Sequence, residues 1–337
     1  MAPTTLYTRL KSYYTGEKEP IKPAMSTNAA VALLVVYTLV YVLPFYISST
    51  IRPSPNLSRD APSVIRGRIA SVTSSCIICS IITFVILCSI VENGNPLQAL
   101  HSMGWFPIGF VETVKTVGLT AILFVGPLFE AGIAEGGWRD WVRLRGLNVI
   151  SGWIGYRNFV AGPITEEVLF RSASVPLLLL SHTSNATIIF LTPVVFGLAH
   201  VHHFYEFRIT HPHTPVIGAL LRSLLQFTYT TLFGGYATFI YLRTGSLLAV
   251  VMVHAFCNWM GFPRFWGRVT NGNETAVSPN TGESKRSEDA VGASTASNGQ
   301  LSIAWTIIYY ILLVVGAVGW KKYLWTLTES PSALTSF

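Results

Sequence analysis

The sequence has 337 residues, of which 50% are hydrophobic and only 12% are charged. Soluble domains usually carry about 25% charged residues, so this composition excludes an ordinary soluble protein. The net charge of +7 is spread along the chain instead of forming one basic run, and this argues against a nucleic-acid-binding protein.

Apolar stretches long enough to cross a bilayer recur along the chain, since a membrane helix needs about 20 mostly apolar residues. Eight such helices are predicted, at 28–50, 69–91, 113–131, 157–178, 186–204, 222–242, 246–263 and 302–321. The predicted fold is an all-α integral membrane protein. It is a single membrane domain over 1–337, a bundle of about eight transmembrane helices that encloses a cavity open to the cytosol and the membrane.

The loops between the predicted helices carry the orientation signal. With eight spans the odd-numbered loops share one side, and they hold twelve Lys and Arg residues against seven on the side of the termini. Because positive loops stay in the cytosol, the odd loops are predicted to be cytosolic. Residues 267–300 are rich in Ser, Thr, Asn and Gly, so the sequence predicts a disordered loop there.

Ionisable side chains inside predicted spans need an explanation, because each costs about 2.5–3.5 kcal/mol on insertion scales. They fall into three groups on successive helices, and each group is predicted to lie toward the same, cytosolic, face. The groups are Glu166, Glu167 and Arg171; Phe196 and His200, followed by His202 and His203; and His254 with Asn258.

Helical spacing assigns each group a geometry. Glu167 and Arg171 are i,i+4 and are predicted to form an ion pair, whose simplest role is structural. Glu166 is turned about 100° away, which leaves its carboxylate free. A single buried histidine is more often a packed residue than a catalyst. A free glutamate, two histidines and an amide at one depth indicate a shared site.

These side chains supply the parts of a hydrolase that uses no covalent intermediate. A glutamate with a histidine can remove a proton from water, and a histidine with an asparagine can donate hydrogen bonds to a developing oxyanion. Two other chemistries stay open from the residues alone. A metalloprotease would use Glu166, His200 and His254 as ligands, and a thiol protease would use Cys257 beside His254, although apolar surroundings disfavour a thiolate.

The three motifs together resemble a known family. Arg157-Asn-Phe-Val-Ala-Gly-Pro-Ile-Thr-Glu166-Glu167, Phe196-Gly-Leu-Ala-His200-Val-His202-His203 and His254-Ala-Phe-Cys-Asn258 resemble the type II CAAX prenyl protease superfamily, and most closely its eukaryotic Ras-converting branch. The strong match covers about 155–263, the predicted catalytic core. A weaker echo occurs at Arg59-Asp60-Ala-Pro62-Ser-Val-Ile-Arg66.

The resemblance implies an endoprotease of the endoplasmic reticulum membrane whose active site faces the cytosol. Its substrates would be farnesylated or geranylgeranylated CAAX proteins such as Ras-like GTPases, from which it would remove the last three residues. By motif position, Glu166 and His200 would activate water, and His254 with Asn258 would form the oxyanion hole. Glu167, Arg171 and Phe196 would support them, with no metal and no other cofactor.

Two alternatives to this function remain. A metal-dependent protease would use the same residues in a different mechanism. A non-catalytic membrane scaffold of the same superfamily would be expected to lose signature residues, and this chain keeps all of them.

Overall fold

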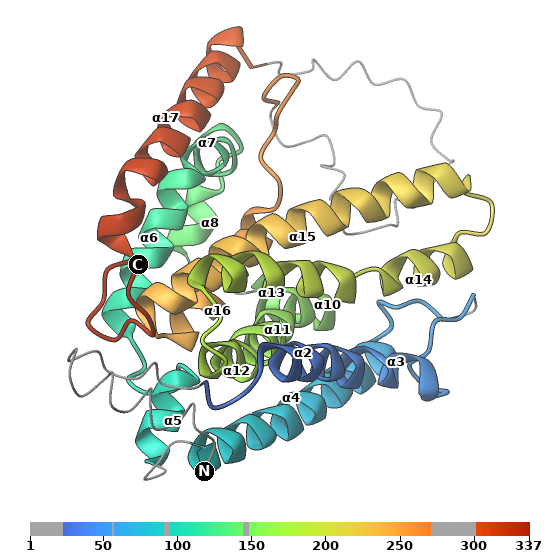
Figure 1. Cartoon of the computed structure of the whole chain (residues 1–337). Coiled ribbons are helices and arrows are strands. Elements are labelled where there is room, and N and C mark those ends of the chain that lie inside the picture. The colour runs from blue at the N-terminus through green and yellow to red at the C-terminus, as the bar shows by residue number, and fades with distance from the viewer. Residues whose placement is uncertain (1–22, 56, 91–94, 144–147, 271–300) are drawn as a thin grey trace, which may run out of the picture.

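Helices make up most of the part of the chain that the computed structural model describes, which is residues 23–55, 57–90, 95–143, 148–270 and 301–337 (Figure 1). Three of the segments, labelled η, are π-helices. In chain order the elements are α2 (Thr27–Val42), α3 (Pro44–Ile47), α4 (Pro62–Ile90), α5 (Pro96–Ser102), α6 (Phe110–Leu123), α7 (Val125–Phe129), η1 (Glu130–Ala134), α8 (Trp138–Val142), α9 (Asn148–Ser151), α10 (Trp153–Tyr156), η3 (Arg157–Ala161), α11 (Gly162–Glu167), η4 (Val168–Ala173), α12 (Val175–Leu180), α13 (Asn185–Ala199), α14 (His202–Thr210), α15 (Val216–Thr244), α16 (Leu247–Met260) and α17 (Ile303–Leu327).

The predicted all-α membrane fold is confirmed, but the count of eight spans is not. Five helices in the described residues are long and apolar enough to cross a bilayer, and a sixth is reached if α6 and the following α7–η1 segment, bent by 80°, form one span. The predicted span 157–178 is a series of short α and π segments instead of one helix. The predicted span 246–263 contains the 14-residue α16.

Prolines account for part of the break in the predicted fourth span. Pro163 stands in the first turn of α11 and Pro176 in the first turn of α12, and each removes a backbone donor to the preceding turn. The π-helices η3 and η4 flank α11 on either side. Such wide turns are frequent at functional sites, and here they isolate the short helix that ends with Glu166 and Glu167.

The core lies where α13 crosses α15, with α2, α4, η4 and α16 packed around the pair. Two glycines allow this close approach. A Cβ added at Gly197 would lie 2.4 Å from the hydroxyl of Thr231, and one added at Gly234 would lie 2.9 Å from Pro193. The crossing holds the polar segments of α11 and α16 against a rigid apolar frame.

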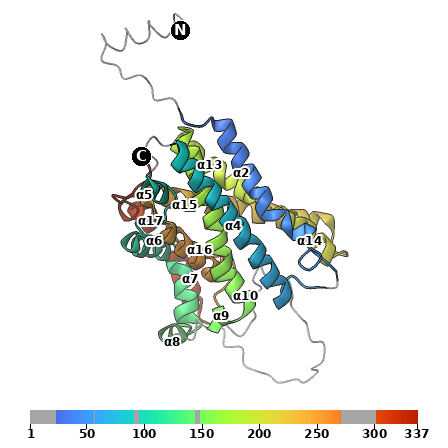
Figure 2. The same ribbon diagram turned by 90° about the horizontal axis from the view of Figure 1, so that it is seen from below.

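Contacts between distant loops gather at two opposite ends of the bundle (Figures 1 and 2). At one end, the loop before α4 meets η3 through the ion pair of Asp60 with Arg157. At the other end, the C-terminal segment meets the start of α13 through a hydrogen bond from Asn185 to the Ser336 carbonyl. The loop before α4 and the C-terminal segment therefore lie at opposite ends of the bundle, and the orientation of these ends in the membrane stays a prediction.

The first four residues of the predicted disordered loop 267–300 are held in place in the structure. Val269 is buried, and its backbone N–H donates to the Thr306 hydroxyl at 3.1 Å. The Gly267 carbonyl accepts a hydrogen bond from Tyr310. The buried Val269 side chain and these two hydrogen bonds hold residues 267–270 against α17. Residues 271–300 lie outside the described residues.

Candidate active site

A buried ion pair joins α11 to η4. Glu167 is fully buried and Arg171 is 1% exposed, and their charged groups lie 3.1 Å apart, which confirms the predicted i,i+4 pair. The second guanidinium nitrogen of Arg171 donates to the Gly234 carbonyl of α15 at 3.1 Å. The guanidinium also lies 4.8 Å from the centre of the Phe196 ring on α13. Arg171 thus ties three elements of the core together.

His254 of α16 lies between the two glutamates of α11. Its Nδ1 is 2.6 Å from Oε1 of Glu167, and its Nε2 is 3.9 Å from Oε2 of Glu166. The sequence did not predict either contact, because both join residues almost 90 positions apart. The Glu166 carboxylate, predicted to point away from the ion pair of Glu167 and Arg171, is partly exposed and faces the His254 ring.

His200 caps the C-terminal end of α13. Its Nδ1 lies 2.8 Å from the Phe196 carbonyl oxygen, which can only accept, so Nδ1 carries the proton and Nε2 is left as an acceptor in the neutral ring. The His200 ring packs edge-on against the Phe196 ring at 4.7 Å. Phe196 thus contacts His200 on one side and Arg171 on the other, which gives this predicted supporting residue a direct role in packing the site.

Asn258 lies one turn after His254 on α16 and is exposed. Its amide nitrogen donates to the backbone carbonyl of Asn158 in η3 at 2.9 Å. The Asn158 side chain in turn accepts from Arg157 at 2.9 Å, and Arg157 pairs with Asp60 at 2.7 Å. Sequence reasoning gave Asn158 and Arg157 no role, although both belong to the quoted motif string.

The segment that contains these motifs is similar to known proteins. Residues 146–260 match the family described as type II CAAX prenyl endopeptidase Rce1-like. A probable CAAX prenyl protease 2 of Schizosaccharomyces pombe is 36% identical over 242 residues, which cover 72% of this chain and 84% of that protein. CAAX prenyl protease 2 of Arabidopsis thaliana is 33% identical, covering 71% and 82%, and that of Homo sapiens is 32% identical, covering 65% and 68%.

The chain belongs to the type II CAAX prenyl endopeptidase family. Membership makes it a protease, as the motifs predicted. No solved structure matches the chain.

The structure also bears on the metalloprotease alternative, whose ligands would be Glu166, His200 and His254, because metal-ligand spacing occurs elsewhere. Among the described residues, the group whose donor atoms lie within 4.8 Å of one another is His202, His203 and Glu206 of α14, and it does not include Glu166 or His254. Glu206 is already neutralised by Arg68 at 2.6 Å. A guanidinium at that position competes with any divalent cation, so the charge balance does not favour a metal there.

The cavity described in the structure also lies away from the glutamates. It has a volume of about 280 Å³ and is lined by residues of α4, α5, α12 and the C-terminal segment, among them Leu87, Ser102 and Leu334. Its lining contains no residue of α11, α13 or α16, so it does not expose the paired glutamates. The predicted cavity that opens to the cytosol and the membrane therefore stays a prediction.

Proposed function

We propose that this endopeptidase removes the C-terminal three residues from prenylated CAAX proteins by direct attack of water, at Glu166, His200, His254 and Asn258. The observation that carries the proposal is the position of His254 between two glutamates of different environment. One carboxylate is buried and paired with arginine, and the other is partly exposed and free to meet substrate. If His254 and the glutamates served only to stabilise the fold, one of the two carboxylates would not need to be exposed.

The exposed carboxylate suits the role of general base. Glu166 would take a proton from the attacking water and later deliver it to the leaving amine. His200 would hold the same water, because its Nε2 is an acceptor and its Nδ1 proton is engaged by the Phe196 carbonyl. The bond that breaks is the amide after the prenylated cysteine, and the products are a new cysteine carboxylate and a free tripeptide.

The buried carboxylate suits the role of orienting His254. Glu167 accepts from Nδ1, which turns Nε2 toward Glu166 and the space beside it. Nε2 lies 3.9 Å from Glu166, too far for a hydrogen bond, so the contact with Glu167 fixes the ring and leaves Nε2 available to the substrate. The Nε2 proton and the Asn258 amide would stabilise the tetrahedral oxyanion.

The membrane setting suits such a substrate. A prenyl chain is apolar and partitions into lipid, so the tail would reach the site from the bilayer. We propose the endoplasmic reticulum membrane as its location, with the site facing the cytosol. The predicted odd-numbered loops carry the excess of Lys and Arg, which favours the cytosol for their side. Substrates would be farnesylated or geranylgeranylated proteins such as Ras-like GTPases.

Purified protein incubated with a farnesylated CAAX peptide tests this proposal. Mass spectrometry should detect release of the intact tripeptide, and the same peptide without the farnesyl group should be a much poorer substrate. Release of single residues, or equal cleavage of both peptides, would contradict the proposed function.

A further inference from the structure

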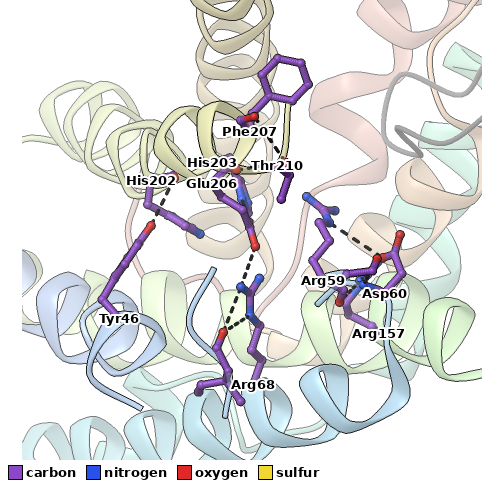
Figure 3. A network of polar contacts seen from close by, with 12 residues as sticks. Tyr46, Arg59, Asp60, Arg68, Arg157, His202, His203, Glu206, Phe207 and Thr210 are labelled. Carbon is purple, nitrogen blue, oxygen red and sulfur yellow. Dashed lines mark hydrogen bonds and ion pairs between the residues drawn. The ribbon is translucent and has the colours of Figure 1, made fainter. Parts of the chain in front are cut away.

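Three arginines surround two carboxylates at the end of the bundle that carries the loop before α4 (Figure 3). Arg68 of α4 pairs with Glu206 at 2.6 Å, and Arg157 of η3 pairs with Asp60 at 2.7 Å. Arg59 lies 3.8 Å from Asp60, too far for a hydrogen bond. Figure 3 shows its guanidinium between the other two pairs. The group therefore has one guanidinium whose charge is poorly neutralised.

The surroundings of Arg59 make that imbalance costly. Burial and the neighbouring Arg157 guanidinium lower the pKa of Arg59, with a smaller contribution from Arg68, and the carboxylates of Glu206 and Asp60 offset this only in part. The side chain nonetheless keeps 33% of its surface exposed. A partly exposed guanidinium among like charges is stabilised by an incoming anion, and a planar carboxylate matches its pair of parallel N–H groups.

The separation between the arginine group and Glu166 is close to the length of a bound tripeptide, so the anion that fits is the C-terminal carboxylate of such a peptide. Arg157 opens η3 and Glu166 lies nine residues later, at most about 13.5 Å along the axis, because the rise of 1.5 Å per residue holds for an α-helix and the π turns of η3 are wider. Three extended residues span about 10 Å, and the difference is within the reach of an arginine side chain. Asn258 lies beside this path, because its amide contacts the residue next to Arg157.

We propose that Arg59, supported by Arg157, binds the free C-terminal carboxylate of the substrate. This inference rests on the proposed function and deepens it. Anchoring the carboxylate at Arg59 while water attacks beside Glu166 would fix the cut three residues from the end. The loop before α4 would then set the number of residues that are removed. This assigns a function to Arg59 and Asp60, which lie in the segment of weaker resemblance.

Peptides that differ only at the C-terminal group test the proposal. A farnesylated CAAX peptide with a free carboxylate is compared with its C-terminal amide, in the native protein and in Arg59→Gln. The native protein should lose roughly ten- to hundredfold in kcat/KM with the amide, mainly through KM, since that is the usual effect of removing a charge-assisted hydrogen bond. Arg59→Gln should lose about as much with the acid peptide and little more with the amide.

Two controls separate this inference from the proposed function. Arg52→Gln removes an exposed arginine of the same loop and should keep the native preference for the acid. Affinity of both peptides for Glu166→Gln protein gives the same comparison without turnover. A native protein that cleaves acid and amide equally overturns carboxylate recognition, and an Arg59→Gln protein that keeps the native preference overturns the assignment to Arg59. Failure to cleave any prenylated peptide contradicts the proposed function itself, whereas equal affinity for the two peptides contradicts this inference alone.

Discussion

Glu167 makes two contacts that a pair of substitutions can separate. Its carboxylate pairs with the buried Arg171, and it also accepts from His254 at 2.6 Å. We predict that Glu167→Leu lowers both the stability and the activity, and that adding Arg171→Met restores most of the stability while the protein stays inactive. The reason is that removing both charges leaves no unpaired charge in the core, whereas the hydrogen bond that orients His254 is still lost.

The magnitudes follow from burial. Removing one partner from a pair that is 0% and 1% exposed leaves an uncompensated charge, which typically costs about 3–5 kcal/mol of unfolding free energy. Replacing both partners by apolar groups of similar size is often close to neutral. The Gly234 carbonyl loses its donor in the double variant, a further cost of about 1–3 kcal/mol if no other partner reaches it. The double variant should therefore be clearly more stable than Glu167→Leu.

Denaturant unfolding in detergent measures the stability, and tripeptide release measures the activity. Arg171→Met alone completes the cycle and should also be destabilised, but by less than Glu167→Leu, because the buried carboxylate keeps its hydrogen bond with His254. Recovery of turnover in the double variant along with its stability would refute the reasoning, since Glu167 would then be a structural residue with no part in orienting His254.

Three further predictions concern the site and its neighbourhood. Asn258→Ala should lower turnover by roughly a hundredfold and leave the affinity for prenylated peptide within a few-fold, whereas Asn258→Asp should gain activity as pH falls until Glu166 is protonated; weaker binding with an unchanged rate would instead make Asn258 a substrate-binding residue. Dialysis of active enzyme against a chelator should leave the rate unchanged, and stoichiometric zinc whose removal and return switch activity off and on would establish the metal-dependent alternative. Replacing residues 271–300 by a short Gly/Ser linker should preserve turnover and unfolding temperature, and a loss of turnover with an intact fold would show that this stretch acts on substrate.

The sequence predicted what depends on local pattern. Uncharged stretches identified the membrane helices, and the i,i+4 spacing of Glu167 and Arg171 predicted their ion pair, because both follow from the period of a helix. It overestimated the number of clean spans because hydropathy does not register a change from α to π turns. The segment around Pro163 is apolar enough to be predicted as one helix, yet it is broken on both sides.

Contacts between segments far apart in the chain could not be predicted from hydropathy or helical spacing. The approach of His254 to Glu167, and that of Asn258 to Asn158, depend on how α16 packs against α11 and η3. The motifs indicated that these helices share a site, but not which nitrogen meets which carboxylate. Arg59 and Asp60 stood in a weakly matching string, and only their contacts with η3 and their position near α14 relate them to the site.

The central claim is that Glu166 and His200 activate water for cleavage of prenylated tails, and single substitutions test it most directly. Glu166→Gln and His200→Ala are purified as monodisperse protein and assayed for tripeptide release from a farnesylated CAAX peptide. Both should bind the peptide with nearly native affinity and release essentially no tripeptide. Substantial turnover by either variant would contradict the account.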